Sequence, residues 1–246
     1  MSGAAAGAAW REQELVCSYL DRRQVLLPLI DIQEDLIERL LGRYERPIAR
    51  VLDLGCGDGA MAELVLGAAP EAQAVLVDFS EPMLARVPAR LERSAPGRWQ
   101  IVHGDLADPR WLQGLPGGSF DAVVSGMAIH HLPAERKREL YAEAFALLAP
   151  GGLFLNMDYV SVSGPLEGLF DEEMHAKAAA HAAHDHPPAD QGGDAVVDDL
   201  DSDEDQPDPL SEQLEWLRQA GYEAVEVHFK WAEASVFGAL KPAEER

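Results

Sequence analysis

The sequence predicts an α/β protein with a doubly wound, mostly parallel sheet, and three observations support that fold class. Between residues 49 and 159, short apolar runs alternate with amphipathic stretches of helical length. The apolar runs are continuous, which is typical of parallel strands covered by helices on both faces. The chain also has 246 residues, of which 47% are hydrophobic, so it can bury one sizeable core.

Buried strands are expected in this region, with helices between them. The strands are expected at Arg50–Leu54, Ala74–Val77, Gln100–His103, Ala122–Val124 and Leu153–Asn156. Apolar residues at helical spacing predict the helices Ala60–Leu66, Pro82–Glu92 and Ala134–Leu148. This alternation of strand and helix indicates one sheet with helices on both sides.

The chain on either side of this region also contains regular elements. Residues 1–48 include the amphipathic stretch Gln13–Leu41, which Pro28 divides into two helices. Residues 210–246 resume the regular pattern and close the same domain. We expect there a helix at Leu210–Ala220, capped by Gly221, and two closing strands at Val225–Phe229 and Ala234–Leu240.

The chain is strongly acidic, and part of that charge is concentrated in one insert. Asp and Glu number 43 against 20 Lys and Arg, which gives a net charge of -23. Residues 161–209 interrupt the pattern, and from Asp185 to Asp208 they hold ten acidic residues and no basic one, so we expect a partly disordered insert. A chain this acidic repels phosphate backbones and anionic lipids, which disfavours nucleic acid and membrane partners.

Cysteine content and hydropathy predict a cytoplasmic protein. Cys17 and Cys56 cannot form a disulfide framework, and no Cys-x-x-Cys pair is present to hold structural zinc. The first residues lack the basic and strongly apolar regions of a secretory signal. No apolar stretch reaches the roughly 20 residues that a membrane span needs. The sequence predicts no oligomeric state.

A glycine-rich loop after the first strand carries the strongest functional signal. Residues 53–59 read Asp-Leu-Gly-Cys-Gly-Asp-Gly, and such glycines let a ligand approach the backbone closely. Asp78 ends the next strand, where a carboxylate can accept both hydroxyls of a ribose. The Gly-x-Gly-x-Gly spacing disfavours a dinucleotide. The carboxylates of Asp53 and Asp58 would repel a pyrophosphate and attract a cationic ammonium or sulfonium.

This loop resembles the first motif of the class I S-adenosylmethionine-dependent methyltransferases. Later segments resemble the further motifs of that family, in order: residues 77–84, 104–106, 120–125 and 147–152. The resemblance is close over about residues 49–159 and looser over 210–240. It implies a Rossmann-like, seven-stranded sheet with an antiparallel edge hairpin. Residues 1–48 would then be an N-terminal helical lid, and 49–160 the cofactor-binding core.

The resemblance also implies S-adenosyl-L-methionine as the methyl donor. Asp78 would bind the ribose. Phe79 or Met83 would lie against the adenine, and Asp105 would accept from its amino group. The full set of cofactor-binding candidates is Asp53, Gly55, Gly57, Gly59, Asp78, Phe79, Met83, Asp105, Leu106 and Ser125. Each has a structural alternative: the glycines can shape a turn, and the aspartates can cap a helix or hydrogen-bond within a strand end.

In this fold the methyl acceptor sits over the carboxyl ends of the fourth and fifth strands. His130 and His131 lie there, and an imidazole can take a proton from an oxygen or amine acceptor, with His130 preferred as the catalytic base. The alternative is that the His-His-Leu-Pro sequence only shapes the loop before the next helix. Asp158 and Tyr159 could orient the acceptor.

Two further groups of side chains have both functional and structural interpretations. Tyr19, Arg22 and Arg23 resemble the lid helix of the family, and one of the arginines could pair with a substrate carboxylate. The alternative is solvated charge on a helix face. The insert contains His175, His181, His184 and His186, but their spacing matches no standard zinc pattern, so we predict no metal site.

The sequence therefore predicts a methyltransferase that acts on a small-molecule acceptor by in-line transfer. One alternative is a methyltransferase acting on RNA or protein, for which the basic cluster Arg86, Arg90, Arg93 and Arg98 is the candidate surface. The other is a non-catalytic module that binds the cofactor and acts through a partner, with the acidic insert as its docking segment.

Overall fold

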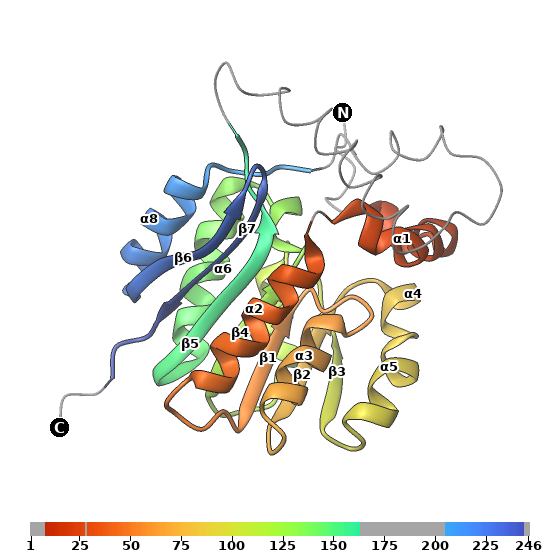
Figure 1. Ribbon diagram of the computed structural model, residues 1–246, viewed down its shortest axis with the longest axis horizontal. Helices are drawn as coiled ribbons and strands as arrows, with labels where there is room; N and C mark the ends of the chain where they lie inside the picture. The colour runs from red at the N-terminus through yellow and green to blue at the C-terminus, as the bar shows by residue number, and fades with distance from the viewer. Residues whose placement is uncertain (1–7, 28, 163–204, 244–246) are drawn as a thin grey trace.

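The computed structural model describes residues 8–27, 29–162 and 205–243, and these contain a seven-stranded sheet (Figure 1). The strands are β1 (Arg50–Leu54), β2 (Gln73–Asp78), β3 (Trp99–His103), β4 (Phe120–Gly126), β5 (Leu148–Tyr159), β6 (Glu223–Trp231) and β7 (Ala234–Leu240). Their order in the sheet is β3-β2-β1-β4-β5-β7-β6. Strands β1 to β5 run parallel, and β7 runs antiparallel to β5 and β6. The predicted fold class is confirmed.

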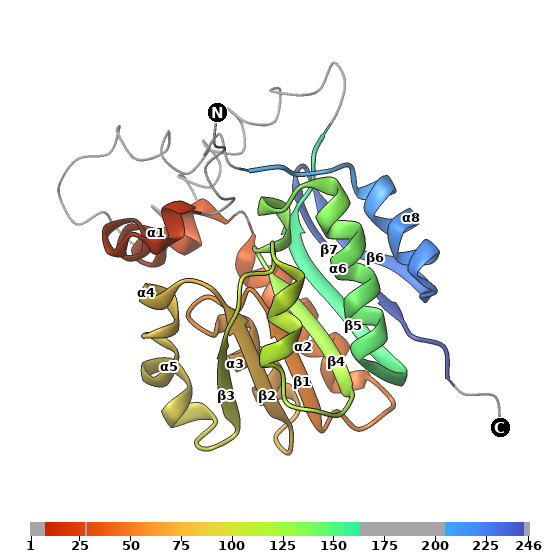
Figure 2. The same ribbon diagram turned by 180° about the vertical axis from the view of Figure 1, so that it is seen from behind.

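Helices cover both faces of this sheet, and an apolar core lies beneath each layer. The described helices and 3-10 turns are η1 (Ala8–Arg11), α1 (Gln13–Leu26), α2 (Ile30–Arg43), α3 (Ala60–Ala68), α4 (Glu81–Leu84), α5 (Val87–Ser94), η2 (Pro109–Gly114), η3 (Ile129–His131), α6 (Ala134–Leu147) and α8 (Leu210–Ala220). Figure 1 shows α2 and α3 in front of the sheet, where Ile37, Val65 and Leu91 share one buried cluster. Figure 2 shows α6 in front of the other face, where Leu140 and Leu217 belong to a second cluster.

Most predicted elements are found, and the differences have local causes. The bounds of β1, β7 and α8 are those predicted. The single helix predicted over Pro82–Glu92 is wrong, because it divides into α4 and α5. Pro88 has no N–H to donate to the Leu84 carbonyl, so one continuous helix is disfavoured there. The fifth strand is longer than predicted, since Leu148 pairs with Phe120 of β4 instead of ending α6.

Most of the insert predicted at residues 161–209, including its four histidines, lies outside the described residues. Its last residues are described, and they are anchored to the sheet. Lys137 of α6, whose side chain is fully buried, donates to the Gln206 carbonyl and to Asp208 Oδ2, the latter at 2.6 Å. The Gln206 N–H donates to the His130 carbonyl at 3.0 Å. Residues 205–208 therefore lie beside η3, at the carboxyl end of β4.

Candidate cofactor pocket and acceptor site

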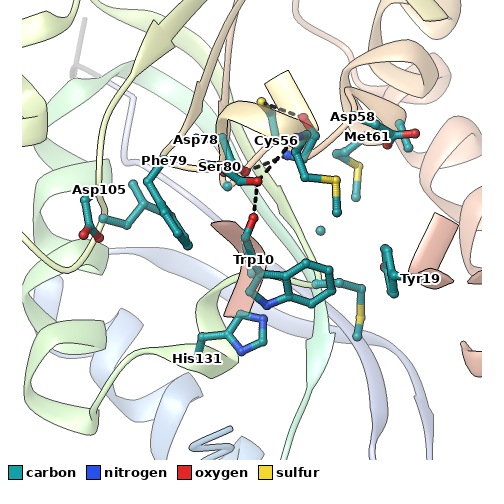
Figure 3. A pocket seen from close by; sticks show the side chains of 18 of the residues that line it. Trp10, Tyr19, Cys56, Asp58, Met61, Asp78, Phe79, Ser80, Asp105 and His131 are labelled. Carbon is teal, nitrogen blue, oxygen red and sulfur yellow. Dashed lines mark hydrogen bonds between the residues drawn. The ribbon is translucent and has the colours of Figure 1, made fainter. Parts of the chain in front are cut away.

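A pocket lies at the carboxyl ends of the parallel strands, close to the point where the strand order reverses between β1 and β4. Open α/β sheets bind ligands at such points, because the loops from the two neighbouring strands diverge there. The loops after β1, β2 and β3 form part of the wall, and residues of η1, α1 and η3 complete it (Figure 3). The pocket thus joins segments that lie more than a hundred residues apart in the chain.

The glycine loop forms the floor of this pocket in a conformation that other residues rarely adopt. Gly55, Gly57 and Gly59 have φ angles of +66°, +54° and +89°. A Cβ on Gly55 would lie 2.3 Å from the Cβ of Ala128, so the chain has no room for a side chain there. Gly55 and Gly57 line the pocket, whereas Gly59 starts α3 and packs against the apolar side chain of Leu91.

Asp78 lies at the end of β2 and holds the glycine loop in place. Its Oδ2 accepts from the Gly57 N–H and its Oδ1 from the Ser80 N–H, both at 2.8 Å. Burial raises the pKa of this carboxyl group, and the two backbone donors work against that rise. Each carboxylate oxygen can accept a second hydrogen bond. Asp78 lines the pocket, so these acceptors are available to a ligand.

The side chains predicted for the adenine gather beside Asp78. Phe79, Met83 and Leu106 line the pocket and offer apolar surface, and Asp105 lies next to them (Figure 3). The Asp105 Oδ1 accepts from the Ala107 N–H at 2.9 Å, which fixes the carboxylate at the pocket wall. A flat apolar slot with one fixed acceptor at its edge suits a purine that carries an amino group.

Asp53 lies beneath the glycine loop and is not part of the pocket wall. Its side chain is fully buried, and neither carboxylate oxygen has a hydrogen-bond donor among the described residues. Burial raises the pKa of Asp53 to about 8, and the nearby Asp78 and Asp58 add to the rise. The Ala62 N–H opposes part of this rise in pKa, although it does not reach hydrogen-bond geometry with the carboxylate. The folded chain therefore keeps the Asp53 carboxyl group protonated at neutral pH, and this neutral group does not supply the negative charge that was expected to attract a cation.

The neighbouring carboxylate of Asp58 is already paired, which corrects the expectation that it would attract a cation. Arg90 of α5 donates to Asp58 Oδ2 from two nitrogens, Nη2 and Nε, the latter at 3.1 Å. Its third nitrogen, Nη1, donates to Glu63 at 2.9 Å. Arg90 therefore neutralises much of the negative charge on this side of the pocket. Cys56 also lies on the pocket wall and is buried. Burial raises the pKa of its thiol well above the usual value, which is typical of a cysteine that packs against its neighbours and does not act as a nucleophile.

The two histidines after β4 occupy different positions, and of the two only His131 lines the pocket. His130 lies behind it and is buried, with Nδ1 2.5 Å from Asp158 Oδ1. Burial lowers the pKa of His130, but the carboxylates of Asp158 and Asp205 outweigh burial, so its pKa is raised. Burial and the neighbouring His130 lower the pKa of His131. The imidazole on the pocket wall is therefore that of His131, and the predicted base His130 is not among the residues that line the pocket.

Two other predicted residues have structural partners instead of a place in the pocket. Ser125 is buried, and its hydroxyl donates to the Leu54 carbonyl at 2.8 Å, which ties β4 to β1. Asp158 was expected to orient the acceptor, but it is buried away from the pocket. It accepts from both the backbone N–H and the ring of His130, so it orients that imidazole.

The side of the pocket beyond the glycine loop is aromatic and apolar. Trp10 and Tyr19 meet edge to face with ring centroids 5.0 Å apart, and Trp10 lies 5.9 Å from the His131 ring (Figure 3). Arg23 also lines the pocket and pairs with Glu34 at 2.8 Å. The side chain of Arg22 lies outside the described part of the structure.

One residue of this wall, Trp10, was missed by the sequence reasoning. It belongs to a short 3-10 turn, where no periodic pattern marks it. Its carbonyl accepts from the Ser80 hydroxyl at 2.5 Å, which holds η1 over the pocket. Met127, which was expected at the carboxyl end of the fourth strand, does line the pocket, and its φ of +55° is uncommon for a residue other than glycine.

Several known proteins with similar sequences are methyltransferases. Residues 51–152 match a family model described as a methyltransferase domain. An uncharacterized methyltransferase of Mycobacterium tuberculosis is 37% identical over 113 residues, which are 46% of this chain and 52% of that protein. A ubiquinone/menaquinone biosynthesis C-methyltransferase of Methylobacterium nodulans is 35% identical over 139 residues, 55% of this chain and 52% of that protein. The chain thus spans about half the length of these curated relatives.

A solved structure extends the similarity beyond the matched region. Human N-acetylserotonin methyltransferase in complex with S-adenosylmethionine aligns with a TM-score of 0.60 at 14% identity. The alignment covers 98% of this chain and 61% of that protein, and at this identity it supports the fold alone. Together these comparisons are consistent with the class I S-adenosylmethionine-dependent methyltransferase family that the sequence motifs predict, since residues 51–152 match a methyltransferase domain and the alignment supports the same fold.

Proposed function

We propose that this chain transfers a methyl group from S-adenosyl-L-methionine to a small-molecule acceptor. The observation that carries the proposal is a single pocket with two chemically different sides. One side offers the glycine loop, Asp78 and the adenine slot beside Phe79. The other offers the aromatic rings of Trp10 and Tyr19 and the imidazole of His131. A donor and an acceptor can therefore meet in one pocket.

The chain's own residues account for cofactor binding. S-adenosylmethionine supplies an electrophilic methyl group on a cationic sulfonium. Asp78 accepts hydrogen bonds from the ribose hydroxyls, and the slot beside Phe79 and Asp105 takes the adenine. The glycine loop gives the ligand close access to the backbone. In-line transfer then depends mainly on how firmly these contacts orient the two reactants.

A small acceptor fits the lining of the pocket. Trp10 is held over the opening by its hydrogen bond to Ser80, which leaves an aromatic and apolar wall for the acceptor. A methyltransferase of quinone biosynthesis is among the relatives, and its name supports an acceptor of small-molecule size. No helix in the described ranges is long and apolar enough to cross a membrane.

The alternative of an RNA substrate is less well supported, because three of the four arginines in the candidate basic cluster are engaged internally. Arg90 pairs with two carboxylates, and Arg98 donates to backbone carbonyls of its own domain. Arg86 donates to the Cys17 sulfur at 2.9 Å. These arginines therefore stabilise the fold around α5, and little of their charge remains for a phosphate backbone.

Replacing Asp78 by alanine is expected to weaken the binding of S-adenosylhomocysteine by about 10–100-fold, because the ribose hydroxyls lose their acceptors. Titration calorimetry of the folded variant measures this loss. Asp78→Asn keeps one acceptor oxygen and should lose less. Asp108→Ala removes a carboxylate that pairs with Arg110 outside the pocket and should leave the affinity unchanged. Equal affinities for Asp78→Ala and Asp108→Ala would contradict the ribose assignment.

The methyl transfer itself is tested with a library of small hydroxyl, amine, thiol and carbon acceptors. The expected result is S-adenosylhomocysteine formation that requires an added acceptor, with a mass gain of one methylene group on the product. A chain that binds the cofactor but releases no S-adenosylhomocysteine with any acceptor would favour the non-catalytic module. Formation only with RNA or protein would favour the other alternative.

A further inference from the structure

Three potential metal ligands converge beside the pocket, although they lie far apart in the sequence. They are His130 and His131 of η3 and Asp205, whose ligand atoms all lie within 4.8 Å of one another. The Asp205 Oδ1 is 2.6 Å from His131 Nδ1 and 3.8 Å from His130 Nε2. Ligands about 2.1 Å from a tetrahedral Zn²⁺ are about 3.4 Å apart. The observed separations bracket that value, so small side-chain shifts would complete the geometry.

The orientation of His130 is the one expected of a metal ligand. Its Nδ1 is bound to the Asp158 carboxylate, which leaves Nε2 directed toward Asp205. Asp158 is itself held, because the Asn156 amide donates to it at 3.3 Å. A histidine that binds a metal through one ring nitrogen generally donates the other N–H to a carboxylate of this kind. This arrangement is already formed in the described structure.

The residues that follow Asp205 are held in position by hydrogen bonds. The next residue, Gln206, donates its N–H to the His130 carbonyl and accepts from the buried Lys137 ammonium through its own carbonyl. Lys137 also pairs with Asp208. The carboxylates of Asp158 and Asp205 contact the two imidazoles, and their two negative charges together match one divalent cation.

We propose that His130, His131 and Asp205 bind a divalent transition-metal ion of the Zn²⁺ type. Two imidazoles and one carboxylate are a ligand set that Zn²⁺ and similar ions take in catalytic sites, where a further position stays open. His131 lines the pocket, so the open position is on the pocket side. The sequence predicted no metal site from the spacing of the histidines in the insert, and it did not indicate this group, because Asp205 is separated from His130 and His131 by more than seventy residues.

The role of the ion rests on the proposed function, whereas the site itself does not. An ion on the acceptor side would bind a hydroxyl or thiol of the acceptor and lower its pKa. The proton leaves to solvent, and the electron pair that it leaves on oxygen or sulfur forms the bond to the methyl carbon. The bond between that carbon and the cofactor's sulfur breaks at the same time, and the sulfonium becomes a neutral thioether. The acceptor class is therefore an alcohol, phenol or thiol.

The test measures metal binding directly, on untagged full-length protein that has been treated with a chelator. Zn²⁺ is titrated against a competing dye, and the visible spectrum of the Co²⁺-loaded protein reports the ligands. We expect the wild type to bind one Zn²⁺ ion tightly per chain. His131→Ala and Asp205→Ala should each weaken this binding by more than about 100-fold, and Asp158→Asn by about 10–100-fold.

Matched controls separate this site from other imidazoles. His228→Ala removes a histidine of β6, and a His181→Ala/His184→Ala double variant removes two histidines of the insert. Both variants should still bind one Zn²⁺ tightly. Thermal unfolding checks that each variant is folded. The proposal would be overturned if the wild type bound no Zn²⁺ tightly, or if the tightly bound Zn²⁺ survived in His131→Ala and Asp205→Ala. The three side chains would then be joined by hydrogen bonds alone. S-adenosylhomocysteine binding, measured in parallel without metal, reports on the proposed function alone.

Discussion

Gly55→Ala is expected to lower the free energy of unfolding by about 2–4 kcal/mol and to weaken S-adenosylhomocysteine binding by about 100-fold. The left-handed φ of +66° costs an alanine about 1–2 kcal/mol. The new Cβ would also lie 2.3 Å from the Ala128 Cβ, so the loop or the segment after β4 must move. Both segments line the pocket, and their displacement affects the ligand directly. Denaturant unfolding and titration calorimetry measure the two effects.

Gly57→Ala is the matched control, because it carries the same backbone cost without the overlap. Its φ is +54°, and the nearest atom to an added Cβ is Met83 Sδ at 3.8 Å. It should lose only about 1–2 kcal/mol of stability. Gly67→Ala in α3, where a Cβ meets nothing within 4 Å, should be neutral or slightly stabilising. If Gly55→Ala and Gly57→Ala proved equally stable, the close contact with Ala128 would not exist.

The fold was predictable because its signals are local. The continuous apolar run at Arg50–Leu54 and the turn at Gly221 carry their structural meaning in a few neighbouring residues, and both are found where expected. The break between α4 and α5 is equally local, since Pro88 cannot donate to Leu84, but the apolar spacing across it concealed the division. Helical periodicity thus predicted the presence of helix more reliably than its continuity.

The candidate site was predictable only where one loop and one strand end define it. The glycine loop and Asp78 lie on consecutive elements, so their meeting follows from the parallel sheet. Which of His130 and His131 faces the pocket depends on the rotation of a three-residue 3-10 turn, and adjacent positions look the same in a sequence. The approach of Trp10 and Asp205 depends on long-range packing that no spacing encodes.

Asp53→Asn is expected to make the stability of the ligand-free protein less sensitive to pH. The pKa of Asp53 is raised to about 8 in the folded chain, against about 3.9 when unfolded. Between these values the unfolded state has lost the proton and the folded state keeps it, so stability falls as pH rises, by about 1.4 kcal/mol per pH unit. Asparagine has no proton to lose. From pH 5.5 to 7.5 the variant should therefore gain about 2–3 kcal/mol relative to the wild type, measured by urea unfolding.

The comparison of two pH values isolates the titration of Asp53 from every constant effect of the substitution. The stability gap is the difference in free energy of unfolding between the variant and the wild type. A poorly placed amide changes this gap equally at the two pH values, and the effects of other titrating groups cancel in it. Asp35→Asn on the exposed face of α2 is the control. Arg39 lowers the pKa of that carboxyl group, so Asp35 is ionised in both states over this range and its gap should stay constant. A constant gap for Asp53→Asn as well would mean that the Asp53 carboxylate is ionised in the folded protein and has a partner. Asp53 would then not be protonated in the folded chain at neutral pH, while the assignment of Asp78 to the ribose would stand on its own contacts.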